Sequence, residues 1–464
     1  MEKEEKFRQA CEKVSLVMER NWRAFDDAGK MQRMEREKRA IMGYEEDMRF
    51  YKEEIHQIIR QEELSEVEPP TWYPNLEEGI FAELYGLAGL APWVYDQMEV
   101  YKRSPSAKLI GERLYCMIDG RAVLQPQKIS RQRREQLKRA LLMATPKERL
   151  EQGFHEIYLH NGIRLTIFSG EKTKDGQDVM VFRKYIMQSL DFQALVELET
   201  IPPDAPDLFR SMIRIGFNVL IAGPVRSGKT TFLEIWQCCE DPSLEGIAIS
   251  TDPEIPWHKL MPDAPLMQIV ADGKELEQIT KPILRGDCDY MILEEMRDAS
   301  AYRLALDITA LGARRCKGTV HTGNAVELPY KMASAISSRF GGETSSLIRQ
   351  VFSSYHYVME FMQDPENPGA KKLKAVVAYC YDEGMDQISV HKICEYVPEE
   401  KNWRWHFFIG TEQEKTGALR PKEMNAMKHM LKQMEKRNPI MGHTTIYPRY
   451  YHPNMKKGGV ELRC

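Results

Sequence analysis

The first 70 residues are highly polar, but their apolar positions recur at the spacing of a helix. Steps of three or four residues place these side chains on one helical face. They are Phe7, Cys11, Val14, Met18, Trp22 and Phe25. Glycines at positions 29 and 43 are expected to interrupt the run. We therefore predict a charged helical extension over residues 1–70 that packs on the chain's own fold rather than on a dedicated partner helix.

Residues 75–200 contain shorter apolar runs, of the length of β-strands. These runs lie at 113–118, 163–168 and 179–182. A polar loop at 170–177 separates the last two runs, and proline pairs bound the region on both sides. The pattern predicts a small N-terminal α/β domain.

From about residue 205 the apolar runs become continuous and alternate with stretches compatible with helices. The runs occupy 217–222, 247–250 and 290–293. Continuous apolar runs of this length are typical of strands buried on both faces in a parallel sheet. We expect a second α/β domain over 205–400. Residues 401–464, rich in Trp, Tyr, His and basic residues, form a tail of unassigned role.

Composition and charge narrow the functional class. The net charge is −4 with 29% charged residues, which argues against a protein coated in nucleic acid. No stretch approaches the roughly 18–20 consecutive apolar residues that cross a membrane, and the charged N-terminus does not resemble a signal peptide. The nine cysteines are scattered without zinc-like spacing, as in a reduced cytoplasmic protein. Any membrane role is expected to come through partners.

The segment 223–230 reads Gly-Pro-Val-Arg-Ser-Gly-Lys-Thr and fits the phosphate-loop pattern GxxxxGK[ST]. An apolar run precedes it and a helix-compatible run follows it, as this motif requires. Glycines at both ends let the backbone curl with its N–H groups directed inward, where they bind phosphate. Lys229 is expected to reach the β- and γ-phosphates, and the Thr230 hydroxyl to bind Mg²⁺. The candidate nucleotide-binding residues are Gly223, Ser227, Gly228, Lys229, Thr230 and Thr231.

An apolar run at 290–293 ends on two carboxylates, Glu294 and Glu295. A phosphate-loop ATPase needs acidic groups opposite the phosphates to hold the metal and to polarise the attacking water. In such folds the ligand crevice lies at the carboxyl ends of the strands, where these glutamates stand. The pattern predicts a RecA-like ATPase core that uses ATP and Mg²⁺.

From 216 to about 324 the chain resembles the secretion ATPases of the type II/type IV superfamily, and most of all the Tad/Flp pilus-assembly branch. Residues 250–255, Ser-Thr-Asp-Pro-Glu-Ile, resemble that family's Asp box, and Glu254 matches its catalytic carboxylate. Ser250 and Thr251 stand where the first two acidic residues of that box are usual. Glu295 matches the Walker B glutamate, with a role at the metal, while Glu294 replaces the usual glycine.

The resemblance extends to further positions. Arg285 and Arg297 fall on recurrent basic positions beside the Walker B motif, and His321 matches the histidine that senses the γ-phosphate. In the N-terminal domain, Arg164 and Arg183 match arginines that close over the nucleotide. The stretch 314–317 is unusual and shorter than the family pattern leads us to expect.

The resemblance implies an ATP-hydrolysing, homo-hexameric motor for secretion or pilus assembly. Its implied partner is a polytopic platform protein of the inner membrane, so the motor would sit peripherally on the cytoplasmic face. Direct nucleic-acid binding is not expected. Two alternatives stay open. One is a nucleic-acid-translocating ATPase. The other is a nucleotide-binding scaffold with weak hydrolysis, which the altered Asp box, the substitution at Glu294 and the short His box favour.

Overall fold

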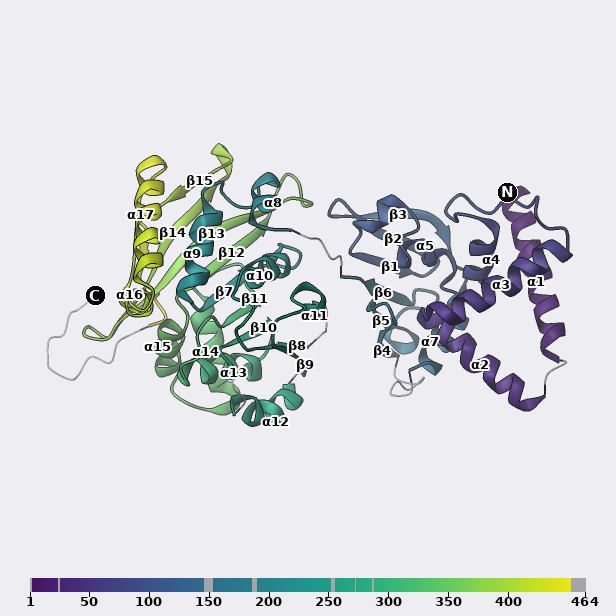
Figure 1. Ribbon diagram of the computed structural model, residues 1–464, viewed down its shortest axis with the longest axis horizontal. Coiled ribbons are helices and arrows are strands. Elements are labelled where there is room, and N and C mark those ends of the chain that lie inside the picture. The colour runs from purple at the N-terminus through teal and green to yellow at the C-terminus, as the bar shows by residue number, and fades with distance from the viewer. Residues whose placement is uncertain are drawn as a thin grey trace. The chain divides into compact units, whose positions relative to one another are not determined.

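The computed structural model describes residues 2–23, 26–145, 153–185, 190–251, 255–271, 273–285 and 288–451. The chain divides into two compact units, Met1–Gln188 and Ser189–Cys464 (Figure 1). Among the helices within the described ranges, none has the length and apolar character to cross a membrane.

The first unit begins with helices and continues into an antiparallel sheet. The helices are α1 (Glu2–Arg23), α2 (Asp27–Met42), α3 (Glu45–Gln61), α4 (Leu76–Leu84), α5 (Ala91–Val94), α6 (Glu99–Lys102) and α7 (Arg131–Met143). The strands are β1 (Ser106–Ile110), β2 (Arg113–Ile118), β3 (Arg121–Lys128), β4 (Phe154–Tyr158), β5 (Arg164–Phe168) and β6 (Val179–Arg183). Their order in the sheet is β3-β2-β1-β6-β5-β4, and every neighbouring pair is antiparallel.

The N-terminal helices and the sheet share one apolar core. Val14 and Met18 of α1 belong to the same buried cluster as Leu109 and Leu165 of the sheet. Most of the predicted helical stripe is buried: Phe7, Cys11, Val14 and Met18. Trp22 is half-buried, and Phe25 lies outside the described residues. The charged N-terminal region is therefore a structural part of the first unit.

The ends of α2 show which glycine interrupts the helices. Asp26 caps the helix by accepting a hydrogen bond from the Gly29 N–H at 2.8 Å, so Gly29 lies inside its first turn. Gly43 ends the helix with φ at 93°, a left-handed conformation that glycine adopts without a Cβ clash. The break between α1 and α2 thus precedes Gly29.

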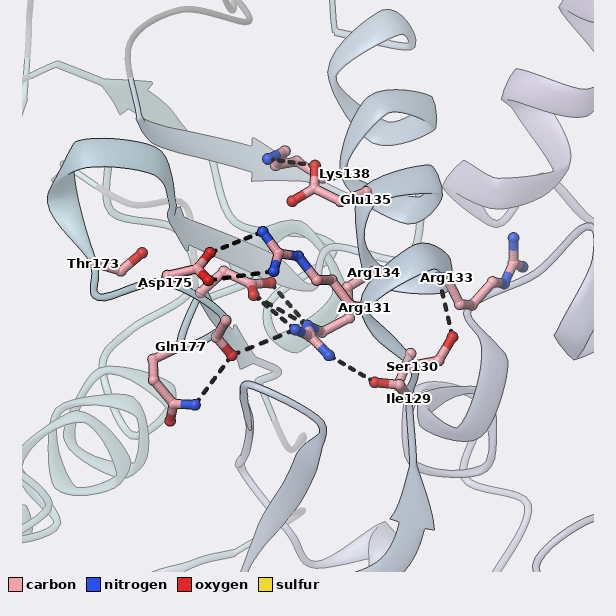
Figure 2. A network of polar contacts seen from close by, with 12 residues as sticks. Ile129, Ser130, Arg131, Arg133, Arg134, Glu135, Lys138, Thr173, Asp175 and Gln177 are labelled. Carbon is pink, nitrogen blue, oxygen red and sulfur yellow. Dashed lines mark hydrogen bonds and ion pairs between the residues drawn. The ribbon is translucent and has the colours of Figure 1, made fainter.

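Arginines of α7 hold the loop between β5 and β6, as Figure 2 shows. The buried Arg134 contacts the Asp178 carboxylate at 3.0 Å and donates to the Ile129 carbonyl at 2.9 Å. Arg131 pairs with Asp175 at 2.8 Å. Because Asp178 directly precedes β6, these contacts fix the β5–β6 hairpin against α7.

The second unit is an α/β fold around a single sheet. Its helices are α8 (Phe192–Glu197), α9 (Ala205–Ile215), α10 (Lys229–Cys238), α11 (Trp257–Leu260), α12 (Gly273–Leu284), α13 (Ala299–Ala310), α14 (Leu328–Phe340), α15 (Thr344–Ser354), α16 (Thr411–Gly417) and α17 (Pro421–Arg437). Its strands are β7 (Val219–Gly223), β8 (Gly246–Ser250), β9 (Leu266–Val270), β10 (Tyr290–Met296), β11 (Lys317–His321), β12 (Tyr357–Gln363), β13 (Lys371–Asp382), β14 (Gln387–Val397), β15 (Asn402–Trp405) and β16 (Thr445–Ile446). The sheet order is β15-β14-β13-β12-β7-β11-β10-β8-β9, with β16 added beside β14.

The strands from β12 to β9 pair in parallel, and those from β12 to β15 pair antiparallel. Leu220 and Ala222 of β7 belong to the core cluster with α13, α14 and α15. On α9 and α10, Phe209 stacks edge-on to Phe232, which also contacts Phe361 of β12. Helices therefore cover both faces of the sheet (Figure 1), and the predicted α/β fold class, with a RecA-like core and a smaller α/β N-terminal region bearing a helical extension, is confirmed.

The C-terminal residues 401–451 complete the second unit. Strand β15 pairs with β14, and α17 packs against α9 through a stripe of buried apolar side chains. This stripe consists of Met424, Met427, Leu431 and Met434. The tail thus supports the helix that leads into β7.

A buried charged group explains the unusual stretch at 314–317. The Lys317 ammonium donates to Gln237 at 2.6 Å and to Glu240 at 2.9 Å, and Arg315 contacts Glu240 at 2.5 Å. Burial lowers the pKa of Lys317, although Glu240 opposes the shift. The group joins the end of α10 to the start of β11, the strand that carries His321.

Candidate nucleotide-binding site

The phosphate loop connects the end of β7 to the start of α10 and requires glycine at both of its ends. A Cβ on Gly223 would lie 2.5 Å from the Ser227 hydroxyl oxygen and 2.6 Å from the Phe361 carbonyl oxygen. Gly228 has φ at 92° and starts the helix. No other residue type fits these two positions without strain. The sequence pattern therefore corresponds to a curled loop at a helix N-terminus, as predicted.

Lys229 lies in the first turn of α10, and its ammonium is turned back onto the loop. Its Nζ donates to the Pro224 carbonyl at 2.8 Å and to His321 Nδ1 at 3.3 Å. Burial lowers the pKa of Lys229 to about 8, and the nearby Glu295 carboxylate opposes the shift. The lysine is thus a partly desolvated cation at the mouth of the loop.

His321 reaches Lys229 because β11 lies beside β7 in the sheet. The two strands are parallel, and His321 is the register partner of Gly223. An ammonium group can only donate, so Nδ1 accepts from Lys229 and Nε2 carries the imidazole proton. Burial and the Lys229 charge lower the pKa of His321, which favours this neutral form.

Glu295, near the end of β10, is the next residue in contact with His321. Its Oε1 accepts from His321 Nε2 at 2.7 Å, and its Oε2 pairs with Arg297. Burial alone would raise the pKa of Glu295, but Arg297 and His321 outweigh it and hold the pKa below its usual value. Lys229, His321, Glu295 and Arg297 therefore form one continuous chain of contacts.

Glu294, the neighbour of Glu295, makes different contacts, and both lie where the register between β10 and β11 shifts, between Leu293 and Met296. Its Oε1 accepts from the indole N–H of the buried Trp257 at 2.7 Å. Its backbone carbonyl accepts from the Thr319 hydroxyl. The extra carboxylate at this position thus binds the start of α11, while Glu295 faces the phosphate loop.

A small hollow lies beside Glu295 and Arg297. Its polar wall is formed by Ser250, Thr251, Gly273, Glu295, Arg297 and Asp298. The Thr251 hydroxyl oxygen is buried and has no hydrogen-bond partner among the described residues. Since Ser250 and Thr251 are neutral, the hollow has less negative charge than the family's usual acidic pair would give.

The remaining predicted residues fall in several places. Thr231 lies in the first turn of α10 beside Thr230. Arg285 directly follows α12 and is exposed. Among the described residues it is not part of the chain of contacts that runs from Lys229 to Arg297. Glu254 lies outside the described residues.

Arg164 and Arg183, the two candidate arginines of the first unit, are direct partners across the β5–β6 hairpin. Such partners project from the same face of the sheet. Arg164 is buried, whereas Arg183 is exposed. The structure therefore brings the two arginines together in the first unit.

Comparison with known proteins finds a family match in the central part of the chain. Residues 172–360, which include the phosphate loop, the Glu295 strand and His321, match the family described as "Type II/IV secretion system protein". This match assigns residues 172–360 to that secretion family. No curated protein sequence matches the chain.

Solved structures of secretion and pilus ATPases match the chain at low identity. The VirB11 ATPase of the Brucella suis type IV secretion system, in complex with sulphate, is 15% identical, covers 62% of this chain and 94% of its own, and has a TM-score of 0.33. The pilus retraction motor PilT with bound ADP is 15% identical, with coverage of 75% and 91% and a TM-score of 0.46. The Legionella pneumophila ATPase DotB is 14% identical, with coverage of 75% and 88% and a TM-score of 0.42.

The residues present fit a nucleotide with its magnesium ion. The Ser227 hydroxyl is buried in the loop and has no hydrogen-bond partner among the described residues, as expected of a group that meets a ligand. No group of three or more metal-binding side chains occurs in the described ranges. Mg²⁺ in ATPases keeps several waters and uses one or two protein ligands plus phosphate, which matches Thr230 and Glu295.

Two further residues lie near the loop although no sequence motif includes them. Gln363, at the end of β12, donates to the carbonyls of Val225 and Arg226. The side chain of Lys371, at the start of β13, lies against Gly228. They lie more than 130 positions after the loop, and only the pairing of β12 with β7 brings them there.

Proposed function

We propose that this chain is the ATP-hydrolysing motor of a secretion or Tad-type pilus-assembly machine. The observation that supports this most is the contact chain from Lys229 through His321 to Glu295 at the mouth of the phosphate loop. It joins a phosphate-binding cation to an acidic group on a neighbouring strand, as ATP hydrolysis requires.

Each residue has a defined task in the proposed reaction. Lys229 and the loop amides bind the β- and γ-phosphates, and Thr230 and Glu295 would hold Mg²⁺. When bound, Mg²⁺ supplies charge neutralisation for phosphoryl transfer. Glu295 or Glu254 orients the attacking water. The rate comes from positioning and preorganised charge.

His321 is proposed as the sensor of the γ-phosphate. In the structure it accepts from Lys229 and donates to Glu295. When Lys229 turns to the phosphates, Nδ1 of His321 loses its hydrogen-bond donor. The contacts of β11, which carries His321, thus depend on whether a nucleotide is bound. Closing and opening of the units would then convert hydrolysis into force on a partner.

The proposed assembly is a homo-hexamer at the cytoplasmic face of the membrane, attached through a polytopic platform protein. Arg164 and Arg183 of the first unit are proposed to contact phosphates, in the same chain or in a neighbouring subunit. Arg285 and Arg297 are proposed to add positive charge.

A second candidate is a nucleotide-binding scaffold with weak hydrolysis. The neutral Ser250 and Thr251 in the wall beside Glu295 favour it, because they leave fewer acidic groups to polarise water. Tight binding of ATP by the wild type without measurable phosphate release would support the scaffold. Stimulation of turnover by DNA or RNA would instead support a nucleic-acid motor.

The test compares two substitutions with a matched control. Lys229→Ala should abolish ATP binding and phosphate release, since it removes the cation of the phosphate loop. Glu295→Gln should retain nucleotide but lower turnover at least a hundredfold, which is roughly the contribution of a positioned acid–base group. Lys281→Ala, an exposed lysine of α12, should behave as wild type.

Near-normal phosphate release by Lys229→Ala would refute the site. Full activity of Glu295→Gln would instead move the catalytic role to Glu254. Phosphate release and equilibrium binding of a fluorescent ATP analogue are the two measurements.

A further inference from the structure

The turn end of the β12–β13 hairpin lies against the outside of the phosphate loop. Gln363 and Lys371 are the last register pair before the turn. The Gln363 side-chain amide donates to the carbonyl oxygens of both Val225 and Arg226, at 3.3 Å each. A single side chain therefore binds two successive carbonyls of the loop.

These two hydrogen bonds determine where the loop amides point. A trans peptide group is planar, with its C=O and N–H directed to opposite sides, and no cis bond occurs in the described ranges. The carbonyl of Val225 shares a peptide group with the N–H of Arg226, and that of Arg226 shares one with Ser227. When Gln363 holds both carbonyls on the outside, both N–H groups point away from it, into the concave side of the loop.

The conformation held in this way is one that arginine adopts with difficulty. Arg226 has φ at 63°, in the left-handed region that favours glycine. For a residue with a Cβ this conformation costs free energy, and it persists only where the surroundings enforce it. The bonds from Gln363 supply that enforcement on the carbonyl of Arg226 itself.

Gln363 is in turn held by an ordered turn. The Asp364 carboxylate accepts from the N–H of Glu366 at 2.9 Å, and the Asp364 N–H donates to the Ala370 carbonyl at 3.1 Å. The Asn367 side chain accepts from the Gly369 N–H at 3.1 Å. These bonds close the turn that joins β12 to β13.

We propose that Gln363 is a positioning residue of the nucleotide site, which holds the phosphate loop in its anion-binding shape around the strained Arg226. This inference rests on the proposed function, because the amides concerned are those that would bind the phosphates. Without Gln363, Arg226 can relax to negative φ and turn amides out of the concave side. Nucleotide binding must then restore the loop conformation, and the free energy that this requires weakens the affinity.

The test measures the dissociation constant of a non-hydrolysable ATP analogue for a set of variants. Gln363→Met keeps the length of the side chain but has no donor, and Gln363→Ala removes it altogether. Both should raise the dissociation constant about three- to tenfold, the effect of losing a neutral hydrogen bond. Gln387→Ala, an exposed glutamine of β14, should leave it unchanged.

A double-mutant cycle with Arg226→Gly separates positioning from general stability. Glycine adopts the left-handed conformation at little cost, so the loop should depend less on Gln363. In the Arg226→Gly background, Gln363→Met should raise the dissociation constant less than twofold. A loss of equal size in both backgrounds would overturn the inference.

The outcome also separates this inference from the proposed function. If the wild type binds the analogue, Lys229→Ala does not, and Gln363→Met and Gln363→Ala bind as tightly as wild type, only the role of Gln363 is refuted. If the wild type itself does not bind, the proposed function fails and this inference fails with it.

Discussion

At the scale of single residues, the site depends on how burial and neighbours set each charge. Lys229 is desolvated by the loop and β11, whereas Glu295 is kept ionised by Arg297 and His321. His321 lies between Lys229 and Glu295 and forms a hydrogen bond with each of them. A lysine with a lowered pKa is charged at neutral pH but loses its proton within an accessible range.

This lysine gives the first pH prediction. Only the ammonium form attracts phosphate, and the pKa of Lys229 in the free protein is about 8. The dissociation constant of an ATP analogue should be nearly constant below pH 7 and should rise about tenfold per pH unit well above 8. Equilibrium titrations from pH 6.5 to 9.5 would measure it.

A second lysine provides the control for that measurement. Lys371 also has a lowered pKa, from burial and the nearby Arg226. If Lys229 causes the rise of the dissociation constant above pH 8, Lys371→Met should show the same rise. Affinity that does not change over this range in the wild type would contradict the assignment.

At the scale of elements, two adjacent glutamates of β10 serve opposite sides of the strand. Glu295 faces the phosphate loop, and Glu294 fixes Trp257 at the start of α11. The main chain of Trp257 is held as well, since its N–H donates to Gln268 of β9 at 3.1 Å. The indole and backbone bonds together tie α11 to two strands of the sheet.

We expect Glu294→Ala to destabilise the second unit by about 1–3 kcal/mol, because the buried indole N–H of Trp257 would lose its acceptor. Glu294→Gln keeps an oxygen acceptor and should be close to wild type. With Trp257→Phe in place, Glu294→Ala should cost clearly less, since no donor is left unpaired. Denaturant unfolding without nucleotide measures these differences, and an unchanged midpoint for Glu294→Ala would refute the role.

At the scale of the whole molecule, the chain places its candidate residues in two units. The phosphate loop and the acidic strand belong to the second unit, while Arg164 and Arg183 belong to the first. The second unit also has an edge strand, β9, that exposes Met267 and Val270.

We predict that an ATP analogue with Mg²⁺ shifts the protein to a closed ring of six copies, each of 53.9 kDa. A head-to-tail contact that repeats between copies either closes into a ring or forms filaments, and the proposed motor uses the closed ring. Light scattering coupled to size exclusion measures the mass with and without nucleotide. Lys229→Ala should not respond to nucleotide, and a strictly monomeric wild type under all conditions would count against the motor.

The sequence by itself determined the phosphate loop and the class of fold. Glycine positions, the Lys229–Thr230 pair and the continuous apolar strands are local features, so their meaning does not depend on distant residues. The helical stripe of α1 was equally readable, because periodicity follows from backbone geometry alone.

Only the tertiary structure decided which residues meet. His321 contacts Lys229, and Glu295 contacts His321, because the sheet order β7-β11-β10 brings their strands together, and no local pattern specifies that order. The task of Glu294 depended on the facing Trp257, and that of Gln363 on the β12–β13 hairpin beside the loop. Contacts between distant segments come from packing. The sequence therefore supplied candidate catalytic residues, and the fold showed which side chains support them.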